Sequence, residues 1–128
     1  MKLEDQVCSL ELAKRLKELG VKQNSLFYWR DSLYNQGVFI PEKILYNPNT
    51  FHENAVTIYE YYSAFTVSEL MMMLPVMTDI TKRSNDYHCR YFYENSTKID
   101  HSFDIKSADC LAKMLIHLLE NKLMELPS

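Results

Sequence analysis

Glycine is almost missing from this sequence, which contains only Gly20 and Gly37 among its 128 residues. Two isolated glycines cannot build the Gly-rich loop that holds nucleotide phosphates, and they cannot build a flexible linker. The G-x-S-x-G motif of serine hydrolases and the H-E-x-x-H motif of zinc proteases are absent as well. These absences argue against an enzyme, and the length is typical of a single domain covering residues 1–128.

Cysteine and long apolar runs are also scarce. Cys8, Cys89 and Cys110 are an odd number of thiols without a short spacing, so we expect free thiols in a reducing cytoplasm rather than a disulfide framework. No apolar run approaches the roughly 18 residues that cross a membrane, and the N-terminus lacks the apolar stretch of a signal peptide. The sequence therefore predicts a cytoplasmic protein that does not bind membranes.

The longest helical pattern lies near the C-terminus, at residues 107–124. Ser107 is expected to cap this helix, and Asp109 is expected to pair with Lys113 one turn later. The apolar residues at helical spacing on one side are Ala108, Leu111, Ala112, Leu115, Leu118 and Leu119. Such a stripe needs a sheet or another helix to cover it.

Two further helices are predicted earlier in the chain. Residues 7–19 place Cys8 on the core face of a first helix, and Gly20 stands where a left-handed C-terminal cap is expected. Thr66-Val67-Ser68-Glu69 matches a capping box, so a short middle helix should run to about Met73 before Pro75 stops it.

The remaining apolar segments predict strands, which lie at residues 26–30, 38–40, 44–46, 56–62, 87–93 and 98–103. The last two form the best hairpin, and one of its apolar faces should rest on the final helix. Residues 78–86 are predicted to be a polar connection. Together the elements predict an α+β fold: a small antiparallel sheet of three to five strands, with the N- and C-terminal helices packed on one face and a short middle helix.

Six side chains have the chemistry of metal ligands, namely His52, His88, Cys89, His101, Cys110 and His117. Cys110 and His117 share the polar side of the last helix but are about 10 Å apart along it, too far for one ion. His88 and Cys89 point to opposite faces of one strand, and His101 opposes either of them, depending on the register. We interpret these as ordinary sheet and surface residues and predict no metal and no cofactor.

Three stretches together resemble a family of small proteins encoded by bacterial phages, prophages and related mobile elements. They are residues 9–23 (SLELAKRLKELGVKQ), running into Phe27-Tyr28-Trp29, residues 62–70 (YSAFTVSEL) and residues 112–123 (AKMLIHLLENKL). The resemblance covers roughly half of the chain, in the same order. It implies expression inside a bacterial host cell, and it brings no catalytic residues.

The function predicted from these observations is that of a phage or prophage accessory protein acting as a non-enzymatic protein-interaction module. Its partner would be a second copy of itself, as a two-fold dimer, or another phage or host protein. The apolar candidates for the contact are Leu10, Met71, Met72, Met73, Met114 and Met124. Methionine is common at adaptable contact surfaces, but it also fills gaps in cores, and the sequence leaves both interpretations open.

The alternative function is a DNA-binding regulator, since residues 10–30 have the spacing of a helix-turn-helix with Gly20-Val21 in the turn. Arg15, Lys17, Lys22 and Arg30 would contact DNA. Two observations weigh against it: residues 26–30 are aromatic enough to favour a strand, and the net charge of the chain is −3.

Overall fold

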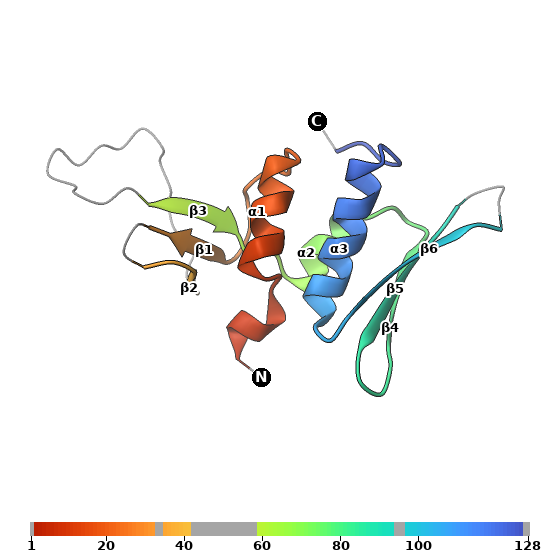
Figure 1. Cartoon of the computed structure of the whole chain (residues 1–128), viewed down its shortest axis with the longest axis horizontal. Helices are drawn as coiled ribbons and strands as arrows, with labels where there is room; N and C mark the ends of the chain where they lie inside the picture. The colour runs from red at the N-terminus through yellow and green to blue at the C-terminus, as the bar shows by residue number, and fades with distance from the viewer. Residues whose placement is uncertain (1, 33–34, 42–58, 94–96, 127–128) are drawn as a thin grey trace, which may run out of the picture.

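The computed structural model describes residues 2–32, 35–41, 59–93 and 97–126. Within these residues, helices occupy the middle of the molecule, and a small antiparallel sheet lies at either end (Figure 1). The elements in chain order are a 3₁₀ helix (Leu3–Gln6), α1 (Leu10–Glu18), β1 (Tyr28–Asp31), β2 (Val38–Ile40), β3 (Glu60–Ser63), α2 (Val67–Met73), β4 (Thr78–Lys82), β5 (Tyr87–Phe92), β6 (Ile99–Asp104) and α3 (Ser107–Glu120). The α+β class is confirmed.

The strands of the described residues form two three-stranded sheets instead of the single sheet expected. In the first, β1 is central, and Trp29 lies opposite Phe39 of β2 and Tyr62 of β3. The strand predicted at residues 26–30 is therefore confirmed as β1, and the brief strand at residues 38–40 as β2. Residues 44–46, predicted as a strand, lie outside the described residues, as does the first part of the strand predicted at residues 56–62.

The second sheet has the order β4-β5-β6 and contains the predicted hairpin, with Cys89 of β5 opposite Ser102 of β6. The polar connection predicted at residues 78–86 is wrong, because Thr78–Lys82 form β4 and pair with β5. Ile80 is the one apolar residue in this strand, so its alternation is nearly invisible in the sequence. Pairing with a strong neighbouring strand has overridden a weak local preference.

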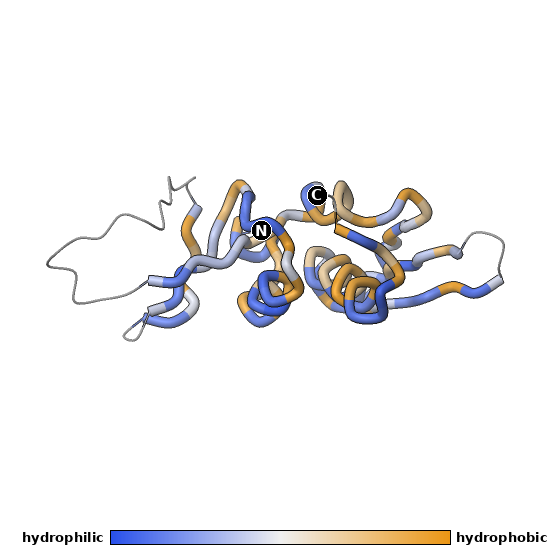
Figure 2. Tube along the Cα trace, turned by 90° about the horizontal axis from the view of Figure 1, so that it is seen from above, coloured by the Kyte–Doolittle hydropathy of each residue, from blue (hydrophilic) through white to orange (hydrophobic). Residues whose placement is uncertain are grey.

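The core is built around α3. Its buried residues are Ala108, Cys110, Leu111, Ala112, Met114, Leu115, Ile116 and Leu118. α3 contacts α1, α2 and the second sheet, whereas α1 contacts α3 and β3 of the first sheet. The two terminal helices thus lie side by side between the sheets, and Figure 2, which looks along them, shows their polar residues on one outer side. No helix of the described residues is long and apolar enough to cross a membrane.

The first helix starts later than predicted, at Leu10, because the preceding residues are extended. Val7 forms a bridge with Thr66, and the Cys8 amide donates to the carbonyl oxygen of Phe65 at 2.9 Å. The predicted core position of Cys8 is confirmed, since this residue is fully buried. Gly20 ends the helix at a φ of +92°, a left-handed conformation that favours glycine, so this cap is also confirmed.

The capping box of α2 is confirmed. The Glu69 amide donates to Thr66 Oγ1 at 3.2 Å, and Glu69 Oε1 accepts from the Thr66 amide at 3.0 Å. Each contact satisfies a backbone amide that the first turn of a helix leaves without a partner. The helix ends at Met73, two residues before Pro75, as predicted.

The first turn of α3 differs from the prediction. The residue preceding the helix is Lys106, and no side chain caps it, so the predicted Ser107 cap is wrong. Asp109 does not pair with Lys113 but accepts a hydrogen bond from the Ser9 amide at 2.6 Å, joining the starts of α1 and α3. Lys113 instead pairs with Asp104 of β6 at 2.5 Å.

Candidate functional site

The sheet of β4, β5 and β6 has one face toward α3 and one face away from it. Ser102 of β6 lies on the face toward α3, because its hydroxyl donates to the carbonyl oxygen of Cys110 at 2.9 Å. Successive strand residues point to opposite faces, so the residues in alternate positions point away from α3. We call this second surface the outer face, and it consists of Asp79, Thr81, His88, Arg90, Phe92, Ile99, His101 and Phe103.

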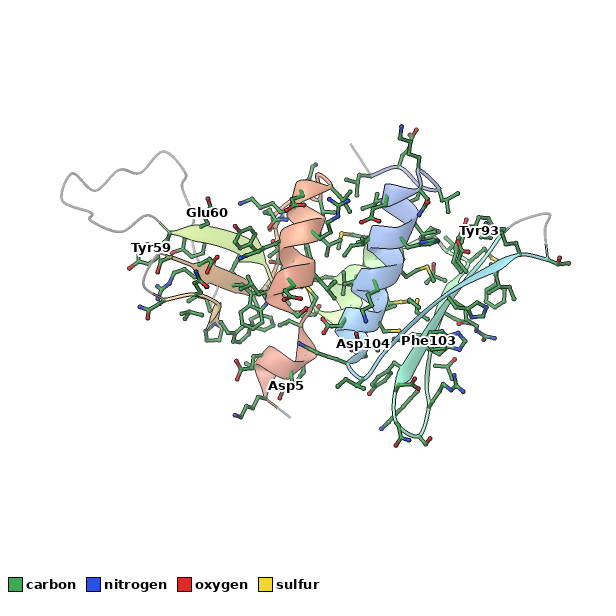
Figure 3. All side chains as sticks on the ribbon, in the orientation of Figure 1. Asp5, Tyr59, Glu60, Tyr93, Phe103 and Asp104 are labelled. Atoms are coloured by element: carbon green, nitrogen blue, oxygen red, sulfur yellow. The ribbon has the colours of Figure 1, made fainter. Side chains whose placement is uncertain are left out.

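The outer face carries the apolar residues of β6, and the helix side of β6 carries its polar ones. Phe103 is 47% exposed and Ile99 is 36% exposed, whereas Asp100 and Asp104 bind α3 through His117 (3.0 Å) and Lys113 (2.5 Å). Figure 3 labels the neighbours Phe103 and Asp104 at this strand. One apolar face of the hairpin was predicted to rest on the final helix. This prediction holds for β5 but is wrong for β6, whose side toward α3 is polar.

An ion pair occupies the middle of the outer face. Arg90 of β5 is opposite Asp79 of β4 and donates to both of its carboxylate oxygens, at 3.1 Å from Nε and 2.8 Å from Nη2. The guanidinium carbon of Arg90 also lies 5.1 Å from the centroid of the Phe92 ring. The two charges balance each other, so the face has a neutral centre with histidine, phenylalanine and isoleucine side chains around it.

Beside this ion pair lie two histidines. The register sets His101 opposite Arg90, which makes His88 its diagonal neighbour across the hairpin. His88 Nε2 and His101 Nδ1 are 2.5 Å apart, while the ring centroids are 4.7 Å apart and the ring planes differ by 20°. Because these two nitrogens are close while the ring centroids are far apart, the two imidazole rings meet edge to edge. The Phe103 ring stacks on His88 with centroids 4.3 Å apart.

The surroundings of His88 favour its neutral form. Partial burial lowers the pKa of His88 below its usual 6.5, and the neighbouring charge of His101 lowers it further. A neutral imidazole has one nitrogen with a proton and one with a free lone pair, so the two facing nitrogens can share one hydrogen bond. The sequence identified both residues but could not bring them together, because the contact depends on the register of the hairpin.

The methionines predicted as partner contacts are scattered. Met114 is fully buried, so its prediction as a surface contact is wrong. Met71, Met73 and Met124 are partly buried and pack against the core. Met72 is 86% exposed at the edge of a hollow of about 340 Å³, which is lined by Gly20, Val21, Lys22, Asn24, Phe65, Glu69, Met72, Met73 and Leu126. Leu10 is half-buried.

The helix-turn-helix predicted at residues 10–30 is wrong in its second half, since Tyr28–Asp31 form the central strand of the first sheet. The four cations predicted to contact DNA do not share one helix. Arg15 pairs with Glu120 at 2.9 Å and with Glu18 at 3.1 Å, and Arg30 lies 4.7 Å from the Tyr59 ring centroid. The predicted helix-turn-helix is therefore absent, and DNA binding itself stays untested.

The other ligand-type residues are dispersed. Cys110 is buried, so its predicted place on the polar side of α3 is wrong, and His52 lies outside the described residues. Burial raises the pKa of Cys89 to about 12, which keeps its thiol protonated. Among the described residues, no three or more His, Cys, Asp or Glu side chains form a group that could hold a metal ion.

Comparisons with known proteins add nothing to this geometry. No family model, no curated protein and no solved structure matches the chain. The outer face is therefore assessed by its own chemistry. Its signal in the sequence was the alternation of Ile99, His101 and Phe103, and what the sequence could not show was that this side of β6 points away from α3.

Proposed function

We propose that this chain is a non-enzymatic interaction protein of a bacterial phage or prophage, and that it associates with a second copy of itself through the outer face. The observation that carries the association is the exposure of Ile99 and Phe103 on a sheet face that points away from α3. The phage origin and the location in the host cytoplasm are supported by the sequence resemblance alone.

A second copy fits the charges of the outer face. Asp79 and Arg90 carry opposite charges side by side at its middle. In a two-fold dimer the same patch meets itself, so a residue of one copy contacts a second residue of the other, and the reverse contact follows by symmetry. Because these two charges offset each other, a second copy of the face is not repelled, and the apolar residues of the two copies can meet.

The area of the outer face determines how strong the self-association is expected to be. Three strands at a spacing of about 4.8 Å and six residues at about 3.4 Å each give a footprint of about 300 Å². A stable interface buries about 800 Å² on each partner. We therefore expect a weak dimer when this face is the whole interface, with association visible only at high protein concentration.

Sedimentation equilibrium of the purified chain, from low micromolar to near-millimolar concentration in a buffer containing EDTA, tests the proposal. The wild-type chain is expected to approach dimer mass, and Ile99→Lys is expected to remain a monomer because it places a charge in the apolar part of the face. Met72→Lys is the matched control, since this exposed side chain of α2 lies outside the face. A monomeric wild type, or equal association by Ile99→Lys, contradicts the proposal.

A further inference from the structure

The arrangement of the two histidines on the outer face suits a second role besides their mutual hydrogen bond. His88 Nε2 and His101 Nδ1 come from adjacent strands and face each other at 2.5 Å. Neutral imidazole nitrogens are common ligands of zinc and of other divalent transition metals. Two such nitrogens directed at one point form a chelating pair.

The distances suit a zinc ion after a small movement. Zinc–nitrogen bonds are about 2.0–2.1 Å, and two ligands at a tetrahedral angle are then about 3.3 Å apart. Opening the pair to this separation takes less than about 1 Å, which rotation about the side-chain bonds supplies. The Phe103 ring stacked on His88 holds that imidazole in place during the change.

The two cations nearest the pair, Arg83 and Arg90, each have a carboxylate partner that reduces their repulsion of a bound cation. Arg90 is neutralised by Asp79 at 2.8 Å, and Arg83, in the turn before β5, is matched by Asp86 at 3.9 Å. Each positive group near the histidines is thus paired with a carboxylate. The carboxylates weaken the repulsion of a divalent ion without removing it, since both arginines still lower the pKa of His88.

Two imidazoles are only half of a closed zinc site, which takes four ligands. The described residues hold no third His, Cys, Asp or Glu grouped with this pair. Two sheets packed face to face are about 10 Å apart, so an ion at the midplane lies about 5 Å from each, a distance that a histidine side chain spans. A second copy turned about a two-fold axis through the ion therefore supplies the two missing nitrogens.

We propose that His88 and His101 of two copies bind one zinc-type divalent ion between their outer faces, which makes the self-association metal-dependent. This inference rests on the proposed function, because it places a second copy on the same face. It also explains how a face of this small area could hold a lasting dimer: the shared ion adds four metal–ligand bonds to the apolar contact.

The test uses zinc chloride as the probe, with the full chain followed by sedimentation equilibrium and isothermal titration calorimetry. We expect half an equivalent of zinc per chain to convert the protein to a dimer, and EDTA to reverse the change. When free zinc is about 100 times its dissociation constant, the dimer dissociation constant should fall about 100-fold by linkage. His88→Ala and His101→Ala should each lose this response. His117→Ala, which alters a histidine of α3 bound to Asp100, should keep it.

The arms of the experiment separate the two proposals. A dimer that forms in EDTA and is unchanged by zinc overturns the metal site and leaves self-association standing. One zinc bound per chain without a change in mass overturns the shared site, as does an unchanged zinc response in His88→Ala. Zinc-driven dimers that His88→Ala abolishes, with a monomer in EDTA at every concentration, support the metal site and contradict association by apolar contacts alone.

Discussion

Replacing Phe103 by alanine removes the largest exposed ring of the outer face while leaving the core untouched. An aromatic side chain has an accessible area of about 200 Å². At 47% exposure, about 90 Å² of Phe103 is free to be buried, which corresponds to about 2.3 kcal/mol at about 25 cal/mol/Å². A two-fold dimer buries this ring twice, so the dimer should lose at most about 4.6 kcal/mol, or about 2,000-fold in its dissociation constant.

The measurement is sedimentation equilibrium in EDTA, with urea unfolding of the same samples to establish that the variant is folded. Loss of the ring contact with His88 should lower the free energy of unfolding by only about 1 kcal/mol. Leu26→Ala is the matched control, because Leu26 is 58% exposed and precedes the first sheet, outside the outer face. A folded Phe103→Ala chain whose dissociation constant changes less than tenfold would refute the reasoning.

Three further predictions concern the fold itself. Leu115→Ala should lower the free energy of unfolding by about 2–5 kcal/mol in urea, because Leu115 is fully buried in α3, and a loss below about 1 kcal/mol would contradict its place in the core. Burial opposes ionisation of Asp100, but hydrogen bonds from Tyr93 and His117 outweigh it and lower its pKa below 3.8. The stability from Asp100 is thus complete above pH 3.8 and lost as the pH falls through the lower folded pKa, so Asp100→Asn should flatten that part of the unfolding profile. Burial raises the pKa of Cys8 and Cys89 to about 12, so a thiol reagent should label neither in the native chain and both in denaturant.

The parts of the fold that the sequence predicted correctly are those with a local physical cause. The α2 start depends on two contacts within four residues, from Thr66 to Glu69, and the end of α1 depends on the conformational freedom of Gly20. The pattern of α3 repeats over four turns, which is long enough to identify its core side. Each of these signals is complete within one short segment.

The parts that failed depend on distant residues. β4 has little apolar pattern of its own and exists because β5 pairs with it. The helix side of β6 is polar because Lys113 and His117 of α3 lie where Asp104 and Asp100 can reach them. For the same reason the candidate site could be predicted only in part. Alternation showed that His101 and Phe103 share one face of β6. The direction of that face is set by α3, which begins several residues later.

The hydrogen bond from the Ser9 amide to Asp109 joins residues that are 100 positions apart. α1 packs against α3, and the largest fully buried side chains include five from α3, namely Cys110, Leu111, Met114, Leu115 and Leu118. A ribosome makes the chain from its N-terminus, so α1 emerges long before the helix that covers it. Closing so long a loop is entropically costly and slow, and we expect the N-terminal half to wait, without a complete core, until α3 has been synthesised.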